Sequence, residues 1–195
     1  MLVIENDHYI AGVQRAVTQN HSGPMREPPC LVVMHYTASG TAESAINWFS
    51  RKNGNASAHV IIDRSGNTVQ MLPFDHVAWH AGASEWQGRG RCNMFSIGIE
   101  LVNWGVLTRH NGDYKSYTYA VVPPDQVVER DGKYWQTYTT RQIAMALCLV
   151  RSLCGHYPIL DVVGHAEIAR PVGRKIDPGP LLDMGTFRKL VRKPT

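Results

Sequence analysis

Two histidines and an aspartate, His35, His165 and Asp177, are the residues of this chain best suited to bind a metal ion. His35 ends the apolar run 31–34, whereas His165 and Asp177 flank a loop rich in glycine and proline. Two imidazoles and one carboxylate form a ligand set for catalytic zinc, which keeps a fourth position open for water. Zinc-bound water ionises near neutral pH, so the set predicts a hydrolytic site with one Zn²⁺.

Each of these residues also has a simpler interpretation. A histidine is more often a hydrogen-bonded surface or core residue than a metal ligand, and Asp177 before Pro178 could start an Asx turn. The metal interpretation gains from the position of His35 and His165 at the ends of strand-like segments, where a rigid scaffold holds functional groups. The residues alone leave both interpretations open.

Glu100 and Lys175 are the candidates for catalytic groups. Glu100 lies in the apolar segment 95–102, where a carboxylate is costly to bury unless it is paired or used, so we expect a general base. The alternative is an exposed strand end at which Glu100 pairs with Arg91. Lys175 lies two residues before Asp177 and could direct its ammonium group at an oxyanion; otherwise it is a solvated loop lysine.

The pair Trp79 and His80 suits a substrate-binding wall, with an aromatic face for a sugar and a hydrogen-bonding tip for a carbonyl. Simple packing of an aromatic beside a histidine is the alternative. The segment 88–93 contains two glycines but lacks the strand-then-helix context of a phosphate-binding loop, which excludes a nucleotide site there.

Strand-like and helix-like patterns are mixed along the chain and predict the elements that must position these residues. Expected strands are 31–34, 58–63, 68–72, 95–102 and 161–164, with 58–72 forming a hairpin; expected helices are 41–50, 139–154 and 186–191, with Gly155 ending the second. The segment 105–138 is an excursion for which a hairpin is the candidate form, with turn signals at 111–112 and 131–132. A central sheet covered by helices follows, in the α/β or mixed α+β class.

Composition predicts a single globular domain over residues 1–195. The chain is 44% hydrophobic and 18% charged, enough for one core. Its net charge of +4 comes from scattered cations, which argues against a nucleic-acid partner. The four cysteines form no Cys-x-x-Cys motif, and the sequence has neither a signal peptide nor a membrane-length apolar run, which predicts no membrane partner and a cytoplasmic location.

Five motifs carry a family resemblance, and they follow one another over residues 31–191. They are 33–38, 57–66, 73–82, 91–93 with 96–101, and 164–165 with 173–180. In these motifs the chain resembles the amidase-2 family of zinc-dependent N-acetylmuramoyl-L-alanine amidases, which is related to T7-type lysozyme and the peptidoglycan recognition proteins. Its likeness to the AmpD branch is strongest in 79–84, 87–89 and 91–93, so Trp79, His80, Arg91 and Asn93 are taken as candidate substrate-binding residues.

The resemblance implies a mixed sheet flanked by helices, of the peptidoglycan-recognition-protein type, and zinc held by His35, His165 and Asp177. It implies hydrolysis of the amide between the lactyl group of N-acetylmuramic acid and L-alanine, in peptidoglycan or muropeptides. With the residue chemistry, the expected mechanism has Glu100 deprotonating zinc-bound water, which attacks the lactyl carbonyl, while zinc and Lys175 stabilise the oxyanion. We expect a monomer.

Two departures from the AmpD branch leave the substrate open between intact wall and 1,6-anhydro-muropeptides. The segment 105–138 is longer than in AmpD, and the segment between Tyr36 and Ser57 is shorter. The main rival is a recognition module that binds muropeptide without cleaving it, although such modules lose a zinc ligand that this chain keeps. The alternative to a cytoplasmic enzyme is a phage lysin or secreted effector delivered to the wall.

Overall fold

The structure, a computed structural model, describes residues 1–52 and 54–191. Its helices are α1 Ala42–Phe49, α2 Thr140–His156, α3 His165–Ile168 and α4 Met184–Arg188, with the 3-10 helices η1 Cys92–Phe95 and η2 Pro124–Gln126. Its strands are β1 Gln14–Arg15, β2 His21–Pro24, β3 Leu31–Tyr36, β4 Val60–Ile62, β5 Thr68–Gln70, β6 His76–Ala78, β7 Glu85–Trp86, β8 Arg89–Gly90, β9 Ser96–Leu101, β10 Val106–His110, β11 Asp113–Lys115, β12 Val121–Val122, β13 Val127–Arg130, β14 Lys133–Gln136 and β15 Asp161–Gly164. Within these described ranges, no helix combines the length and apolar character needed to span a membrane.

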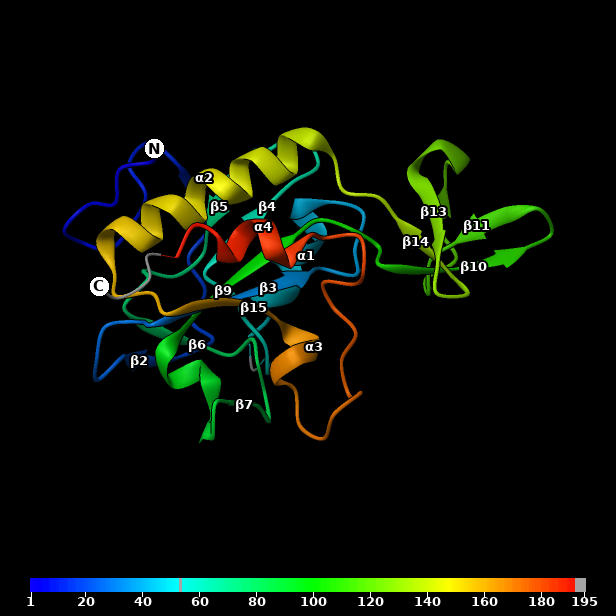
Figure 1. The fold of residues 1–195 in the computed structure, drawn as a ribbon. Helices are drawn as coiled ribbons and strands as arrows, with labels where there is room; N and C mark the ends of the chain where they lie inside the picture. The colour runs from blue at the N-terminus through cyan, green and yellow to red at the C-terminus, as the bar shows by residue number, and fades with distance from the viewer. Residues whose placement is uncertain (53, 192–195) are drawn as a thin grey trace.

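Six strands form the central sheet, in the order β1-β5-β4-β9-β3-β15 (Figure 1). β4, β9, β3 and β15 run parallel to their neighbours in this series, whereas β5 is antiparallel to β4. The sheet is therefore mixed and carries helices, which confirms the fold class predicted from the sequence. The β4–β5 pair also confirms the hairpin expected within 58–72.

The two faces of the sheet have different tasks because successive side chains of a strand point to opposite faces. Val32 and Met34 of β3 and Ile99 of β9 share one buried core cluster with Leu149 of α2 and Phe187 of α4. Figure 1 shows α2 and α4 lying over this face. Burying each large apolar side chain stabilises the fold by about 1.5–3 kcal/mol. The alternate residues of β3 and β9 face the other way, toward the site.

The helix boundaries follow local capping. Thr41 caps α1 by accepting a hydrogen bond from the Ser44 amide, so that helix is where the sequence predicted it. The prediction that Gly155 ends α2 is wrong, because the helix continues to His156. Tyr157 then turns extended, as expected for a residue before proline, where a clash disfavours the helical conformation.

The final helix also differs from its prediction over 186–191. It begins at Met184, directly after the N-cap Asp183, whose carboxylate accepts from the Gly185 amide. An aspartate accepts hydrogen bonds from the unpaired amides of the first turn, which fixes the start of α4 two residues earlier than the apolar pattern indicated.

The excursion 105–138 is a second sheet of five antiparallel strands, in the order β12-β11-β10-β14-β13 (Figure 1). A single hairpin was too simple an expectation, because each of the two predicted turns closes its own hairpin, β10–β11 and β13–β14. The ribbon shows this insert sheet standing beside the layered body. Its base contacts the Asp177 loop: the Tyr138 hydroxyl donates to the Pro178 carbonyl at 2.6 Å.

We predict that Gly105 is essential for joining the insert sheet to the central sheet. Gly105 has φ +71°, and a Cβ there would lie 2.3 Å from Cζ of Tyr36. Gly105→Ala should lower the free energy of unfolding by about 2–4 kcal/mol, because it combines left-handed strain with overpacking. Gly112→Ala is the matched control, since its φ is +87° but nothing lies within 4 Å. Equal losses in urea unfolding of the two variants would contradict the packing argument.

Candidate metal centre and active site

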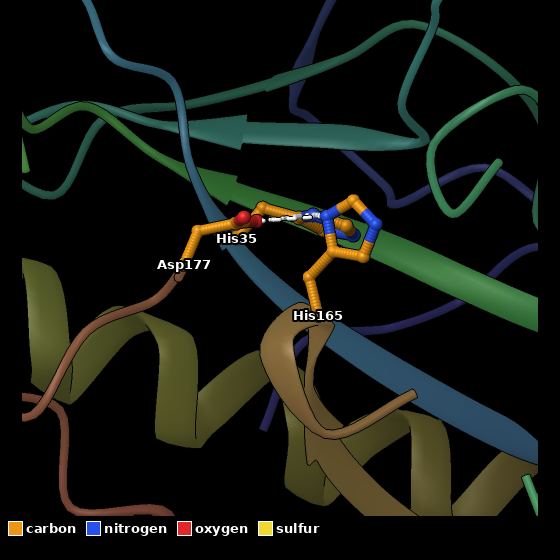
Figure 2. Close-up of side chains that lie close together, drawn as sticks. All are labelled: His35, His165 and Asp177. Carbon is orange, nitrogen blue, oxygen red and sulfur yellow. Dashed lines mark hydrogen bonds and ion pairs between the residues drawn. The ribbon is translucent and has the colours of Figure 1, made fainter. Parts of the chain in front are cut away.

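Three side chains from separate parts of the chain converge on one point, as Figure 2 shows. Oδ2 of Asp177 lies 2.9 Å from Nδ1 of His35 and 3.0 Å from Nδ1 of His165. The two Nδ1 atoms are 3.1 Å apart, and all three residues are buried. The structure therefore brings together the three residues that the sequence singled out as metal ligands.

Parallel strand pairing is what places the two histidines side by side. β15 pairs with β3 so that Gly164 is opposite Met34. The residue that follows each of these two in the chain is a histidine. His165 begins α3, while the Ala166 amide donates to the Asp177 carbonyl at 2.8 Å. That hydrogen bond holds the returning loop against α3 and directs Asp177 at both rings.

The tautomer of His165 follows from its hydrogen bonds. Its Nε2 lies 3.0 Å from the carbonyl oxygen of Ala81, which can only accept. In the neutral ring the proton is therefore on Nε2, and Nδ1 presents a lone pair to the convergence point.

The tautomer of His35 is set by a chain of buried partners. Ser96 Oγ donates to the Cys92 carbonyl at 2.6 Å, so it accepts from Nε2 of His80 at 3.1 Å. Nδ1 of His80 is then an acceptor, and Nε2 of His35 donates a hydrogen bond to it at 3.1 Å. Like that of His165, the Nδ1 atom of His35 is left with a lone pair.

Two imidazole lone pairs and a carboxylate oxygen facing one another repel unless a cation lies between them. Burial lowers the pKa of His35, which favours the neutral, ligating form. Two neutral imidazoles and one carboxylate fit a divalent transition ion, and zinc in particular.

His80 has room behind His35 because of a glycine. A Cβ on Gly98 of β9 would lie 2.5 Å from Cγ of His80, so only glycine admits the ring at this position. The carboxamide oxygen of Asn93 accepts from the amides of His80 and Ala81 at 3.2 and 2.7 Å. Asn93 thus holds the backbone of His80, which bonds His35, and of Ala81, whose carbonyl bonds His165. The His80 ring is hydrogen-bonded to His35.

Glu100 lies beside His35, because β3 and β9 pair in parallel with these two residues opposite each other. It is 7% exposed, so the alternative of an exposed glutamate paired with Arg91 is wrong. Its Oε2 is buried without a hydrogen-bond partner. Burial, reinforced by the charge of Asp177 and opposed by Lys175, raises the pKa of Glu100 to about 8. A carboxyl group in this state is suited to proton transfer.

A cavity of about 360 Å³ opens over these groups. The predicted residues Trp79, His80 and Lys175 line it together with the three convergent side chains and Glu100. Sequence reasoning missed further residues of the lining, among them Tyr36, Trp48 and Arg174. The exposed Trp48 of α1 was the available signal for a binding surface. Arg91 is exposed at the start of η1 with φ 61°, and substrate contact by Arg91 or Asn93 stays a prediction.

Comparison with known proteins identifies the family. The Amidase_2 family, N-acetylmuramoyl-L-alanine amidase, matches residues 25–180. The chain belongs to this family. It is 32% identical to the 1,6-anhydro-N-acetylmuramyl-L-alanine amidase AmpD of Escherichia coli (strain K12), with 96% of each chain covered.

Two solved structures extend this likeness to the fold of the amidase. A selenomethionine derivative of AmpD matches with TM-score 0.71 and 29% identity, covering 97% of this chain and all of that one, 100%. AmiD from E. coli, solved with anhydro-N-acetylmuramic acid-L-Ala-D-γ-Glu-L-Lys, matches with TM-score 0.63 and 26% identity, covering 96% of this chain and 65% of that chain. The family resemblance and the enzyme class predicted from the sequence are confirmed: this chain is an N-acetylmuramoyl-L-alanine amidase.

The hydrogen-bond chain through His80 predicts how firmly this site would bind a zinc ion. His80→Phe removes the acceptor for the proton on His35 Nε2. The ring can then carry its proton on Nδ1, the nitrogen that faces the zinc site, so zinc affinity should fall by about 10–100-fold. His80→Gln keeps an oxygen that can accept this proton and should recover part of the loss. Competition with a chromogenic chelator measures both affinities. Equal affinity of His80→Phe and the unchanged amidase would refute the orienting role.

The raised pKa of Glu100 predicts a pH-dependent stability of the metal-free amidase. Between its ordinary value of 4.5 and about 8, the folded state binds a proton that the unfolded state has released, so stability decreases as pH rises. Glu100→Gln removes this loss and should be more stable than the unchanged chain by about 1–4 kcal/mol at pH ~8, with little gain at pH ~5. Urea unfolding with chelator at both pH values tests this. A gain that is independent of pH would contradict the assignment.

Proposed function

We propose that this amidase is a zinc-dependent hydrolase that cleaves the amide between the lactyl group of N-acetylmuramic acid and L-alanine in muropeptides, 1,6-anhydro forms included. The observation that carries the proposal is the pair of imidazole lone pairs and the Asp177 oxygen converging next to a buried, unpartnered Glu100. The named activity of AmpD and the muropeptide in the AmiD structure support the choice of substrate.

His35, His165 and Asp177 would hold the zinc ion. When bound, zinc supplies Lewis acidity that polarises a carbonyl and lowers the pKa of water. The three residues come from a strand end, a helix start and a loop that are fixed to one another by backbone hydrogen bonds. Such fixed donors need little reorganisation during the reaction.

Glu100 would carry the proton through the reaction. As a carboxylate it takes a proton from the attacking water, whose oxygen forms a bond to the lactyl carbonyl carbon. It then returns that proton to the alanine nitrogen, so that the carbon–nitrogen bond breaks and an amine leaves. A nearby dication lowers the pKa of a buried carboxyl group, which brings Glu100 toward its basic form at neutral pH.

Lys175 and the wall residues would act on the rest of the substrate. Lys175 lines the same cavity as Glu100, and its ammonium group would stabilise the oxyanion of the tetrahedral state. Trp79, His80, Arg91 and Asn93 would form or support the substrate-binding wall. For His80 and Asn93 the support is indirect, through the ring of His35 and the 80–81 backbone.

A recognition module that binds muropeptide without cleaving it is the competing function. Such a module has no use for a buried carboxyl group, and leaving Oε2 of Glu100 without a partner costs about 1–3 kcal/mol. This free-energy cost has a functional reason when the carboxyl group serves as a base. The hydrolase is therefore the better account of this site.

Two variants separate metal binding from catalysis. Glu100→Gln should keep zinc and lower kcat by about 10²–10⁴-fold, the usual contribution of a general base. His35→Ala should lose both zinc and activity, because it removes a ligand. Mass spectrometry of products from soluble anhydro-muropeptide and from purified sacculi measures peptide release, and metal analysis measures zinc. Zinc-loaded wild-type enzyme that releases no peptide from either substrate would overturn the proposed function.

A further inference from the structure

A second cavity of about 390 Å³ adjoins the catalytic one. The two share the lining residues Thr37, Ala38, Trp48 and Phe49, so they lie next to each other. The far wall of the second cavity comes from the insert sheet and its approach, through Trp104 and the loop 117–118. This aromatic groove, as we call the second cavity, therefore exists only because the insert is present.

Two aromatic residues of the groove are exposed to solvent. Trp48 is 50% exposed and Tyr117 is 72% exposed, and contiguous exposed apolar patches mark ligand-binding grooves. Trp104 and Tyr117 meet edge to face, with ring centroids 6.3 Å apart. Trp104 packs over Gly40, where a Cβ would lie 2.9 Å from its Cζ2. The guanidinium of Arg51 stacks 4.4 Å from the Trp48 ring and steadies it.

The loop that carries Tyr117 is held in one shape. The Ser116 amide donates to the Ala120 carbonyl at 2.9 Å, and the Tyr119 amide donates to the Ser116 carbonyl at 2.9 Å. Ser116 Oγ also accepts from the Ala120 amide at 3.1 Å. A fixed loop lets an exposed ring bind without a large loss of conformational entropy.

The charge distribution distinguishes the aromatic groove from the catalytic cavity. Among the described residues, the lining of the aromatic groove contains no charged side chain, but it has five hydroxyl residues, Thr37, Ser39, Ser44, Tyr117 and Thr118. The catalytic cavity carries Arg174 and Lys175 instead. The substrate has two arms at the scissile amide: an uncharged sugar and a peptide which, as in the AmiD ligand, contains γ-linked glutamate and lysine. Uncharged hydroxyl and aromatic groups match the sugar.

We propose that the aromatic groove is a glycan subsite that binds the sugar rings on the muramyl side of the scissile amide. The apolar faces of the rings pack on Trp104 and Tyr117, and their hydroxyl groups bond the polar residues of the wall. The peptide arm then extends toward Arg174 and Lys175. This inference rests on the proposed function, and it adds a preference for substrates with more than one sugar.

The test varies the sugar and the peptide independently. Substrates are an N-acetylmuramyl peptide and its N-acetylglucosaminyl-N-acetylmuramyl counterpart, each with a short and a longer peptide. The amidase should have a kcat/KM about tenfold higher for the disaccharide forms, because their KM is lower while kcat is unchanged. Tyr117→Ala and Trp104→Ala should abolish this preference, because they raise KM more for the disaccharide forms than for the monosaccharide forms. Tyr119→Ala is the matched control, because this 76% exposed ring on the same loop lies outside the groove lining.

A binding measurement keeps this test separate from catalysis. The probe is an N-acetylglucosamine trimer, titrated into zinc-loaded Glu100→Gln protein and followed by calorimetry. Binding that Tyr117→Ala weakens about tenfold or more and Tyr119→Ala leaves unchanged supports the subsite. Equal rates on mono- and disaccharide substrates, or Tyr117→Ala losses that track peptide length, would overturn it. If the amidase cleaves none of the four substrates, the proposed function fails while the trimer titration still decides the groove.

Discussion

The parallel pairing of β3 with β9 and β15 is the constraint on which the site depends. It places Glu100 opposite His35 and brings His165 to the same sheet edge, one residue beyond Gly164. Parallel strands end together, so residues distant in sequence meet without any long side chain having to reach across. The face of the sheet opposite these groups is packed under α2 and α4, and this packing keeps the register from slipping. A shift by one residue would turn every one of these side chains to the wrong face.

Buried polarity is organised as a line of hydrogen bonds from the backbone to the convergence point. Ser96, His80 and His35 each donate one hydrogen bond, to the Cys92 carbonyl, to Ser96 and to His80 respectively. The carbonyl of Ala81 fixes the proton of His165 in the same way. Because an unpaired polar group in a protein interior is costly, each partner leaves its neighbour with only one favourable proton position. Around the convergence point, the facing lone pairs and the Glu100 carboxyl depart from this pattern, and they are the groups suited to chemistry.

The insert sheet contacts both the loop that carries Asp177 and the wall of the aromatic groove. At its base, Trp135 packs so closely on Gly179 that a Cβ there would lie 2.8 Å from the indole, and Tyr138 bonds the Pro178 carbonyl. Both contacts hold the loop that ends in Asp177. At the other side the insert supplies Trp104 and Tyr117 to the groove. One element thus contacts the loop that carries Asp177 and forms part of the groove wall.

Local sequence signals predicted the apolar strands, the capped helices α1 and α2, and, through the ordered motifs, the amidase family. They also singled out His35 and His165 at the ends of strand-like segments, Glu100 within an apolar segment, and Asp177 beside a loop rich in glycine and proline. The burial of Glu100, the position of His80 against His35 over Gly98, and the five-stranded sheet of 105–138 emerged only in three dimensions. Local patterns carry propensity and periodicity, whereas burial, proton position and strand order arise from residues far apart in the chain.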